Sequence, residues 1–249
     1  MKLPESPQEL QDALWEVGYL ADPSLIMSVW LALSMGRPLL LEGEAGTGKT
    51  DLAKALAGAL DLELIRLQCY GGIDQHQALY EWDYTRQILY MRALSSKEIT
   101  TDDAIESLFG DRFLMERPLL RAMKAGGKCL LLIDEIDRAD DEFEAFLLEV
   151  LSDFQVSIPE LGTIKASEPP VVILTSNRTR DLHDALKRRC LYHWIDTPTM
   201  GHEIQIAEVC APDMPDRLTS RLGKAKNAFG RKAAAAAAEQ EDELSMGAG

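Results

Sequence analysis

Short apolar runs, each bounded by polar or turn-forming residues, recur along most of this chain. Apolar runs of this length are typical of parallel strands, because both faces of such strands are buried. They are also far too short to cross a membrane. The pattern therefore predicts a mostly parallel, five-stranded sheet, with strands over 38–41, 64–68, 128–133, 170–175 and 191–195.

The stretches between these runs carry helical periodicity. Asp22, Pro23 and Ser24 are typical of a helix start, and the apolar residues that follow recur at helical spacing as far as Gly36. Further helices are expected over 51–60, 140–153 and 181–187. In the second of these, the apolar residues form one stripe, and the acidic residues form an opposite face that we expect to be solvated. Alternating strands and helices predict an α/β fold, a doubly wound sheet with helices on both faces.

Three segments do not follow this alternation. Residues 71–91 are rich in aromatic, glutamine and charged residues, and we interpret them as an inserted or exposed segment. Residues 154–166 alternate apolar and polar positions around a Pro-Glu-Leu-Gly turn, which predicts a β-hairpin. The end of the chain has low complexity and is expected to fray, with a basic stretch at 224–232, alanines at 233–238 and an acidic stretch at 239–243.

Composition narrows the classes of protein. The chain has 249 residues, of which 46% are hydrophobic, which is enough to form a core and excludes a wholly disordered protein. Its 41 acidic residues outnumber the 26 lysines and arginines, so the formal net charge is -15 and non-specific binding to nucleic acid or anionic lipid is not expected. The sequence shows no apolar leader, and its four cysteines form no CxxC pair. We therefore expect a cytoplasmic protein with no integral membrane segment and no cysteine-based metal site.

A phosphate-binding motif lies between the first predicted strand and the helix after it. Residues 43–50 read GEAGTGKT, which satisfies the pattern GxxxxGK followed by Ser or Thr. Glycines let such a loop curl with its amides inward, and the helix start adds partial positive charge. Lys49 would neutralise the β- and γ-phosphates, and Thr50 would ligate Mg²⁺. A glycine-rich turn that arose by chance is the alternative, which the flanking strand and helix disfavour. We expect the nucleotide to be held by Gly43, Glu44, Ala45, Gly46, Thr47, Gly48, Lys49, Thr50 and Asp51.

Two adjacent carboxylates, Asp134 and Glu135, end the apolar run at 128–133. Ligands of open α/β sheets bind at the carboxyl ends of the strands. Asp134 would hold Mg²⁺ through its water shell, and Glu135 would orient and activate the attacking water. The alternative is a strand that simply runs into an acidic turn, and the phosphate-binding motif makes that less attractive. We interpret Asp137 and Arg138, which follow, as residues that lead into a helix or as intersubunit groups.

Further polar candidates lie at the end of the fourth predicted strand and directly after the helix that precedes the fifth strand. Asn177 ends the fourth run, where its amide could hydrogen-bond the γ-phosphate or the lytic water, although asparagine is also common in caps and turns. Arg188 and Arg189 stand before the fifth run. They are either solvated surface charges or an arginine finger that reaches the γ-phosphate of a neighbouring subunit.

The ordered motifs GEAGTGKT, LLLIDEID, TSN and RRC resemble those of AAA+ ATPases. Within that class, DEIDRAD and residues 78–89, 147–166 and 186–196 are similar to the MoxR group, including members that mature the molybdenum–copper carbon monoxide dehydrogenase. The likeness covers roughly residues 15–200. It implies ATP and Mg²⁺ as ligands and a hexameric, chaperone-like ATPase, with a client metalloenzyme and a partner that carries a von Willebrand factor A domain.

The resemblance also implies roles for single residues. Asn177 corresponds to sensor 1 and Arg189 to the finger, with Arg188 as a substitute. The segment 71–91 corresponds to an insert near the pore face, and the hairpin contacts partners. Members of the group also carry a helical lid with a second sensor arginine. Here we find no clear equivalent, and Arg217 and Arg221 are weak candidates, so we expect a core over 1–200, a reduced lid over 201–232 and a low-complexity tail over 233–249.

Three functions compete at this point. The leading hypothesis is an ATP-driven remodeller that assists assembly of a metalloenzyme. A nucleic-acid motor or loader could use the same fold, but the acidic balance and the lack of interleaved basic and aromatic residues weigh against it. A scaffold that binds ATP and scarcely hydrolyses it is the third, because the lid is reduced. Replacing Glu135 should leave the ATPase rate of such a scaffold unchanged.

Overall fold

The computed structural model describes residues 3–94, 108, 111–159, 161–197 and 205. The chain divides into two compact units, residues 1–196 and 197–249, and the description below concerns the first unit. The lid expected over 201–232, including Arg217 and Arg221, lies outside the described residues except for residue 205, and the tail expected over 233–249 lies wholly outside them.

A parallel five-stranded sheet forms the centre of the first unit, as the apolar runs predicted. Its order is β2-β5-β8-β1-β9, and every neighbouring pair is parallel. The strands are β1 (Leu39–Gly43), β2 (Glu63–Gln68), β5 (Cys129–Asp134), β8 (Val171–Ser176) and β9 (Leu191–Ile195). Because all five run the same way, the residues that follow β1, β5 and β8 meet at one edge of the sheet, which is where α/β proteins bind ligands.

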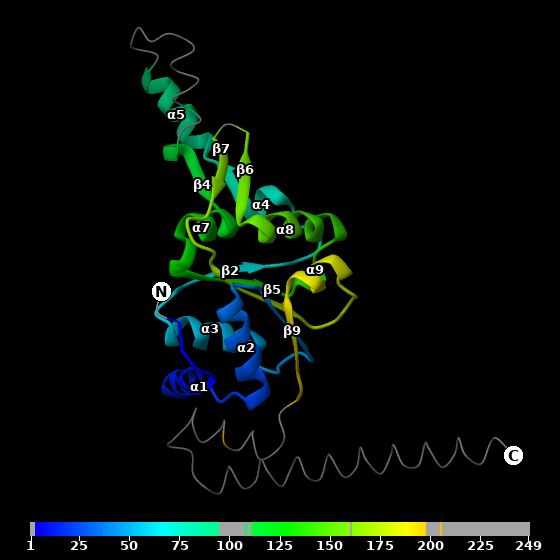
Figure 1. Ribbon diagram of the computed structural model, residues 1–249. Helices are drawn as coiled ribbons and strands as arrows, with labels where there is room; N and C mark the ends of the chain where they lie inside the picture. Colours follow the sequence, from blue (N-terminus) through cyan, green and yellow to red (C-terminus); the bar gives the residue numbers. More distant parts are fainter. Residues whose placement is uncertain (1–2, 95–107, 109–110, 160, 198–204, 206–249) are drawn as a thin grey trace, which may run out of the picture. The chain divides into compact units, whose positions relative to one another are not determined.

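Helices cover both faces of this sheet, as expected for a doubly wound fold (Figure 1). One face carries α1 (Pro7–Glu16), α2 (Pro23–Met35) and α3 (Lys49–Ala59), and the other carries α7 (Pro118–Ala125) and α8 (Asp141–Asp153). Alternate residues of β1 serve the two layers: Leu39 and Leu41 pack with the first set, and Leu40 packs with the second. Burial on both faces explains why the strands are continuously apolar.

Local chemistry explains where α2 begins and ends. The carboxylate of Asp22 accepts hydrogen bonds from the backbone N–H groups of Ser24 and Leu25, at 2.8 and 2.9 Å, and Pro23 occupies the first turn. Gly36 ends the helix in the left-handed conformation, with φ of 59°. The start and end expected from the sequence are therefore confirmed.

Four helices of the described residues were not predicted from the periodicity, and α1 and α7 are two of them. Ser6 caps α1, and Pro7 begins it, but the helix buries only Leu10 and Leu14. The eight-residue helix α7 begins at Pro118. Both helices are short, so each offers only two or three turns from which a period could be read.

Residues 71–91 were interpreted as an inserted or exposed segment, and exposure is wrong for the central part of the segment. This segment holds α4 (Gln75–Leu79), β3 (Tyr80–Trp82) and most of α5 (Tyr84–Leu94). Strand β3 pairs antiparallel with β4 (Leu114–Glu116), and Ala78, Leu79, Tyr80 and Trp82 are buried. Exposed residues lie on both sides of this buried part: Gln75, His76 and Gln77 on α4 are exposed, and so is Tyr84 at the start of α5, at 64%.

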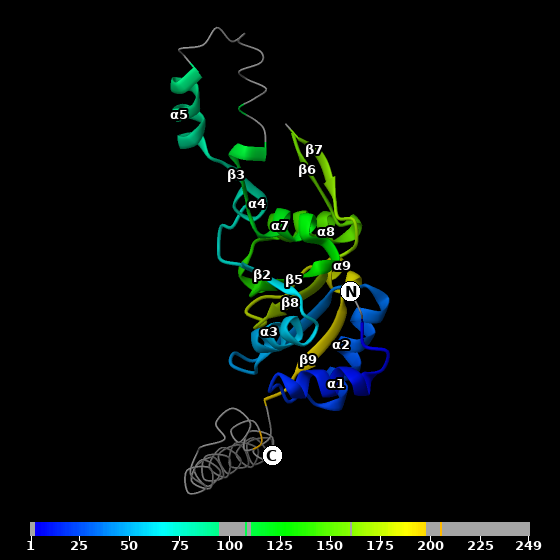
Figure 2. The same cartoon turned by 90° about the vertical axis from the view of Figure 1, so that its left-hand side faces the viewer.

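The hairpin expected over 154–166 is confirmed. It consists of β6 (Gln155–Ile158) and β7 (Gly162–Lys165), which pair antiparallel with Val156 opposite Ile164. Figure 2 shows the two strands extending together from the layer that contains α8. Short 3-10 segments complete the described elements: η1 (Asp111–Phe113), η2 (Gly126–Lys128) and η3 (Ile136–Arg138).

Two details of the last helices differ from expectation. The acidic face of α8 is not uniformly solvated, because Glu144 is fully buried and pairs with Arg180. Helix α9 spans Asp184–Arg189 and not 181–187, since the Nδ1 atom of His183 accepts a hydrogen bond from the backbone N–H of Ala185 and caps the helix. Arg188 and Arg189 therefore lie within its last turn. In the described ranges, we find no helix both long and apolar enough for a membrane span.

Candidate phosphate-binding site

A cavity of about 210 Å³ lies at the carboxyl edge of the sheet. Its wall combines the loop after β1, the first turn of α3 and the residues that end β5 and β8. The lining residues are Ala45, Gly46, Thr47, Gly48, Lys49, Thr50, Asp51, Asp134, Glu135, Thr175 and Asn177. Two motifs that are far apart in the sequence are thus brought together around one space.

The glycines of the loop meet two different requirements. Gly46 and Gly48 have φ of 85° and 87°, in the left-handed region that favours glycine. At Gly43 the requirement is space, because a Cβ there would lie 2.4 Å from the carbonyl oxygen of Ile195 on β9. Helix α3 then begins at Lys49, so the unpaired N–H groups of its first turn lie at the cavity, where an anion is favoured.

The ammonium group of Lys49 is held inside the loop. Its Nζ donates hydrogen bonds to the carbonyl oxygens of Gly43 and Glu44, at 2.8 and 2.7 Å. The sequence had suggested that Gly43 and Glu44 hold the nucleotide. They do not line the cavity, and their carbonyl oxygens position the ammonium group of Lys49 instead. Lys49 is 6% exposed, and burial lowers the pKa of its ammonium group, although nearby carboxylates such as Asp137 and Asp134 oppose this.

Asp134 lies across the cavity from the loop and is 2% exposed. Its carboxylate accepts hydrogen bonds from the Oγ1 of Thr50 at 3.0 Å and from the Oγ1 of Thr175 at 2.5 Å. The guanidinium of Arg66 on β2 also pairs with it, with Nε at 3.0 Å. A carboxylate and a hydroxyl oxygen side by side are hard donors of the kind that Mg²⁺ prefers, so these two residues fit that ion.

Glu135 follows directly and adopts an uncommon backbone conformation, with φ of 55°. Its backbone N–H donates to the Oγ1 of Thr175 at 2.9 Å. Three donors hold its carboxylate: the side-chain nitrogens of Gln68, Arg138 and Asn177, at 3.0, 2.9 and 3.4 Å. Left-handed backbone at a non-glycine residue is strained, and such residues cluster at functional sites.

Asp137 is a buried carboxylate and not an exposed intersubunit group. It lies in η3, which leads into α8, and is 2% exposed. Burial alone would raise its pKa, but hydrogen bonds from the hydroxyl and backbone N–H of Thr179 and from the backbone N–H of Asn177 outweigh this and lower it. These contacts, at 2.7, 2.9 and 3.2 Å, attach the loop after β8 to the segment after β5.

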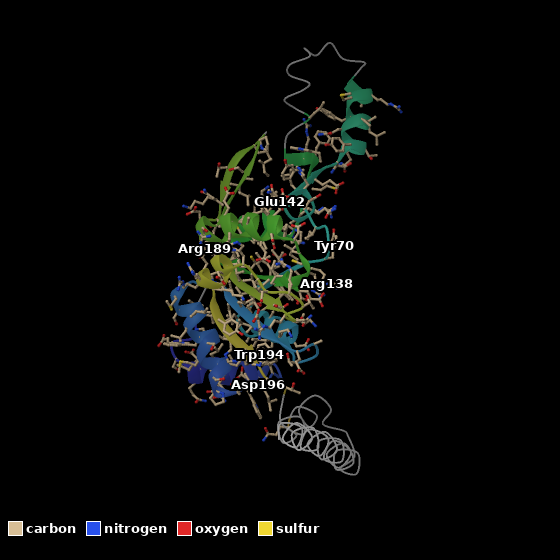
Figure 3. The ribbon with its side chains drawn as sticks, turned by 90° about the vertical axis from the view of Figure 1, so that its right-hand side faces the viewer. Tyr70, Arg138, Glu142, Arg189, Trp194 and Asp196 are labelled. Carbon is tan, nitrogen blue, oxygen red and sulfur yellow. The ribbon has the colours of Figure 1, made fainter. Side chains whose placement is uncertain are left out.

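The structure does not bring Arg188 and Arg189 to the cavity of their own chain. Both are exposed on α9, and Arg189 donates to the carbonyl oxygen of Leu148 on α8 at 3.4 Å. Figure 3 shows Arg189 on the opposite side of the view from Arg138, which contacts Glu135. Their assignment as a finger for another subunit stays a prediction.

Three residues at the site were not identified from the sequence. Thr175 bridges the carboxylate of Asp134 and the N–H of Glu135. Arg66 and Gln68 reach the same two acids from β2, the neighbouring strand. A signal was available, because Arg66 and Gln68 are the polar positions within the otherwise apolar run 64–68.

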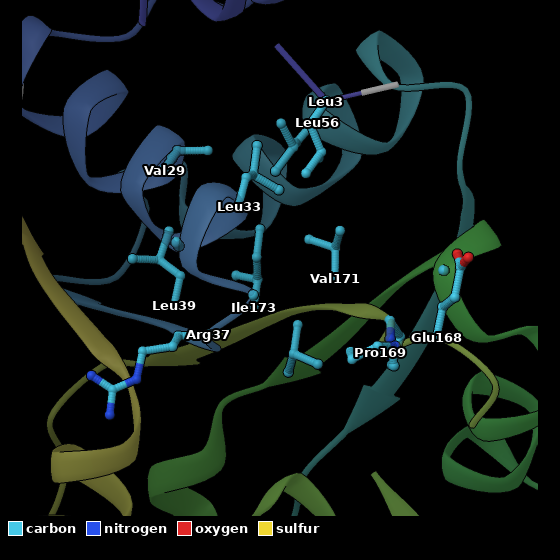
Figure 4. Close-up of a pocket in the computed structure, with 15 residues that line it drawn as sticks. Leu3, Val29, Leu33, Arg37, Leu39, Leu56, Glu168, Pro169, Val171 and Ile173 are labelled. Carbon is cyan, nitrogen blue, oxygen red and sulfur yellow. The ribbon is translucent and has the colours of Figure 1, made fainter. Parts of the chain in front are cut away.

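Another cavity in the described residues is less suited to binding a charged ligand. A cavity of about 340 Å³ lies at the opposite ends of β1 and β8, and its wall is mostly apolar (Figure 4). Arg37 and Glu168 also contribute to the wall, but Figure 4 shows the Arg37 guanidinium pointing away from the apolar side chains. Within the described ranges, no three His, Cys, Asp or Glu side chains are grouped to hold a metal ion. The smaller polar cavity is thus the candidate site.

Comparison with known proteins agrees with this geometry. The model of the ATPase family associated with various cellular activities (AAA) matches residues 39–195. The uncharacterized protein YojN of Bacillus subtilis is 29% identical over 211 residues, which is 81% of this chain and 60% of YojN. The uncharacterized protein YehL of Escherichia coli is 29% identical over 177 residues, 67% of this chain and 43% of YehL.

A crystal structure from Cytophaga hutchinsonii, of a protein described as a candidate ATPase, has a similar fold. Its TM-score is 0.55 at 18% identity, and the match covers 81% of this chain and 56% of that one. At this identity the likeness concerns the fold alone. The chain spans 43%, 62% and 60% of the length of three curated relatives that it matches, and therefore less than two thirds of each.

Proposed function

This chain belongs to the AAA family of ATPases, and from that premise we propose that it is a magnesium-dependent, cytoplasmic ATP hydrolase that remodels other proteins. One observation carries the proposal: Lys49, Asp134 and Glu135 converge on a single polar cavity at the start of a helix. A cation, a hard carboxylate ligand and an adjacent second carboxylate are the groups that phosphoryl transfer to water requires.

Each group has a distinct task in this proposal. The N–H groups at the start of α3 and the ammonium of Lys49 bind the phosphates and neutralise part of their charge. Thr50 and Asp134 hold Mg²⁺, which supplies further charge neutralisation when bound. Thr175 and Arg66 keep the Asp134 carboxylate in place.

Glu135 acts as the general base in this proposal. It is held at the cavity by Gln68, Arg138 and Asn177, so the direction of its carboxylate is fixed before substrate arrives. Asn177 lines the same cavity and carries an amide that can bind the γ-phosphate or the water. A neutral amide there adds no negative charge beside the phosphates.

We further propose that the active form is a homo-oligomer, a hexameric ring in which an arginine of one subunit completes the site of the next. Support comes from α9, where Arg188 and Arg189 are exposed and do not line their own cavity. Arg189 is the first candidate for the finger and Arg188 the substitute, as the resemblance to the MoxR group implies.

The client in this proposal is a metalloenzyme under assembly, such as a molybdenum–copper carbon monoxide dehydrogenase, with a von Willebrand factor A domain protein as a partner. Its support is the likeness of DEIDRAD and residues 78–89, 147–166 and 186–196 to MoxR sequences. No part in binding nucleic acid is proposed, in view of the net charge of -15.

A Glu135→Gln variant tests hydrolysis and the client together. It keeps the size of the side chain and removes the carboxylate, so ATP should still bind while steady-state hydrolysis is lost. The matched control is Glu149→Gln, an exposed position on α8, which should hydrolyse ATP like the parent. Equal rates for Glu135→Gln and the parent would contradict the catalytic role and favour a scaffold.

The same variant can trap the client. With ATP bound and hydrolysis blocked, pull-down from the native host should recover a metalloenzyme that the Glu149→Gln control does not retain. Recovery of nucleic acid, or retarded migration of DNA at physiological salt, would contradict the proposed class of client.

A further inference from the structure

A short irregular segment, residues 177–183, connects the phosphate cavity with α9. Asn177 lines the cavity at one end, and α9 begins directly after His183 at the other. The exposed arginines Arg188 and Arg189 lie in the last turn of α9. The contacts that hold this segment in place therefore determine the position and direction of α9, and with it those of Arg188 and Arg189.

Asp137 holds the first part of the segment. Its buried carboxylate accepts the N–H of Asn177 at 3.2 Å and both the N–H and the hydroxyl of Thr179, at 2.9 and 2.7 Å. Arg178, between them, is forced into the left-handed region with φ of 57°. Strain on the order of 1 kcal/mol at a non-glycine residue persists only where surrounding contacts over-determine the backbone.

Glu144 and Arg180 hold the second part. Glu144 on α8 is fully buried, accepts the N–H of His183 at 2.8 Å and pairs with the guanidinium of Arg180. Arg180 also donates through Nε to the carbonyl oxygen of Ala139 at 2.9 Å and through NH1 to Asp141 at 3.2 Å. One side chain thus connects the segment to the residue before α8 and to two acids within that helix.

These contacts reach back to the proposed general base. Glu135 begins the stretch that continues through η3, which carries Asp137, to Ala139, which accepts the bond from Arg180. A displacement of Glu135 therefore moves both anchors of the segment 177–183. Its own backbone is strained as well, so two strained residues, Glu135 and Arg178, flank the bonds of Asp137.

A stabilising role alone does not account for the Glu144–Arg180 pair. Desolvation offsets much of the attraction in a buried ion pair, and well-packed apolar residues often stabilise a fold as well or better. What such a pair provides is a fixed direction, because its hydrogen bonds are satisfied in only one arrangement. That property suits an element that must hold α9 at a defined angle.

We propose that Asp137, Arg180 and Glu144 are positioning residues that couple Glu135 in one subunit to α9, and hence to the arginines that α9 offers to the next subunit. This inference rests on the proposed function, since it requires hydrolysis in an oligomer. Arg180 and Glu144 do not line the cavity, so we expect their variants still to bind ATP.

Arg180→Met tests the inference in the full chain. The variant removes the charged guanidinium and its hydrogen bonds and keeps an unbranched apolar stem. We expect the kcat for ATP to fall at least about tenfold while KM stays within about twofold, a smaller loss than the 10³- to 10⁵-fold typical of deleting a finger. The matched control is Arg121→Met, which removes an exposed cation of α7 that pairs with Glu63 and should leave both constants unchanged.

Mixed oligomers separate positioning of the neighbour from damage to the variant's own site. Arg180→Met subunits keep an intact cavity, whereas Glu135→Gln subunits keep an intact α9. If α9 acts on the next subunit, an equal mixture of the two impaired proteins should show about one quarter of the parental rate per subunit, above the rate of either variant alone, because half of the intact cavities then meet an intact α9.

Each outcome decides between the two proposals. No recovery in the mixture, or parental activity of Arg180→Met alone, would overturn the positioning role and leave ATP hydrolysis standing. A parent that binds but never hydrolyses ATP would instead overturn the proposed function. Should Arg180→Met fail to fold, Glu144→Gln takes its place in the same mixture, since a glutamine can still accept the N–H of His183 while the ion pair is lost.

Discussion

Thr175 offers a sharp test of how the site is built. It is 1% exposed at the end of β8 and makes two hydrogen bonds through one hydroxyl. The hydroxyl donates to the Asp134 carboxylate at 2.5 Å and accepts the N–H of Glu135 at 2.9 Å. Thr175→Val keeps the shape of the side chain and removes both bonds, so packing changes little while the polar contacts are lost.

The magnitude follows from these two contacts. A hydrogen bond to a charged group contributes about 1.5–3 kcal/mol, and a buried donor left without an acceptor costs about 1–3 kcal/mol. Asp134 keeps its bonds to Thr50 and Arg66, and Glu135 is only partly buried, so water can reach its N–H. We therefore expect Thr175→Val to lower the free energy of unfolding by about 2–3 kcal/mol, towards the lower end of the combined range.

Function should change in parallel. Thr175 orients a proposed Mg²⁺ ligand, and loss of such a supporting contact typically costs about 10–100-fold in metal affinity or activity. Urea denaturation gives the stability change, and the Mg²⁺ dependence of ATPase activity gives the metal effect. Thr163→Val is the matched control, because its hydroxyl contacts Ser157 at 3.1 Å on the exposed hairpin and its loss should cost less than about 0.5 kcal/mol.

A Thr175→Val variant that unfolds at the same urea concentration as the parent and requires no more Mg²⁺ would contradict this expectation. Such a result would mean that the bridge between Asp134 and Glu135 contributes nothing to either the fold or the site. A loss of stability equal to that of Thr163→Val would lead to the same conclusion.

Three further outcomes can be measured by chemical denaturation. Gly43→Ala should lower the free energy of unfolding by about 1–3 kcal/mol, because the new Cβ meets the backbone oxygen of Ile195 at 2.4 Å and neither can swing away; an unchanged value would contradict this. Burial lowers the pKa of His193 below 6.5, so the unfolded chain binds a proton first as the pH falls. Stability should therefore decrease below about pH 6.5, and His193→Gln should reduce that slope. Phe143→Ala, at a side chain only 1% exposed, should cost about 3–5 kcal/mol, and a loss below about 1 kcal/mol would show that the core around α8 is loosely packed.

The central sheet was predictable because burial on both faces leaves a strong trace in the sequence. All five strands occur where the apolar runs indicated, and the hairpin also followed from its alternation and its turn residues. Helix α1 was not predicted, since it buries only Leu10 and Leu14 and leaves the pattern weak. The segment 71–91 was interpreted wrongly for a different reason. Its buried aromatic residues, Tyr80 and Trp82, are mixed with polar residues, and this mixture resembles an exposed loop.

At the site, the side chains that line the cavity were easier to identify from the sequence than the side chains that hold those residues in position. Lys49, Thr50, Asp134 and Asn177 line one cavity, as the motifs suggested. Glu144 was expected to be solvated, because its partner, Arg180, is distant in sequence and no local pattern connects them. Contacts between distant segments depend on strand order, and strand order is not encoded in any single motif.

The central claim is that the cavity between the loop after β1 and the end of β5 binds Mg²⁺ and ATP. Calorimetric titration of Mg²⁺-ATP into the parent chain, Lys49→Met and Lys54→Met tests it directly, because Lys54 lies on the same helix but is exposed and pairs with Asp51. We expect a saturable heat for the parent and for Lys54→Met, and none for Lys49→Met. Absence of heat in the parent, or equal binding by Lys49→Met, would contradict it.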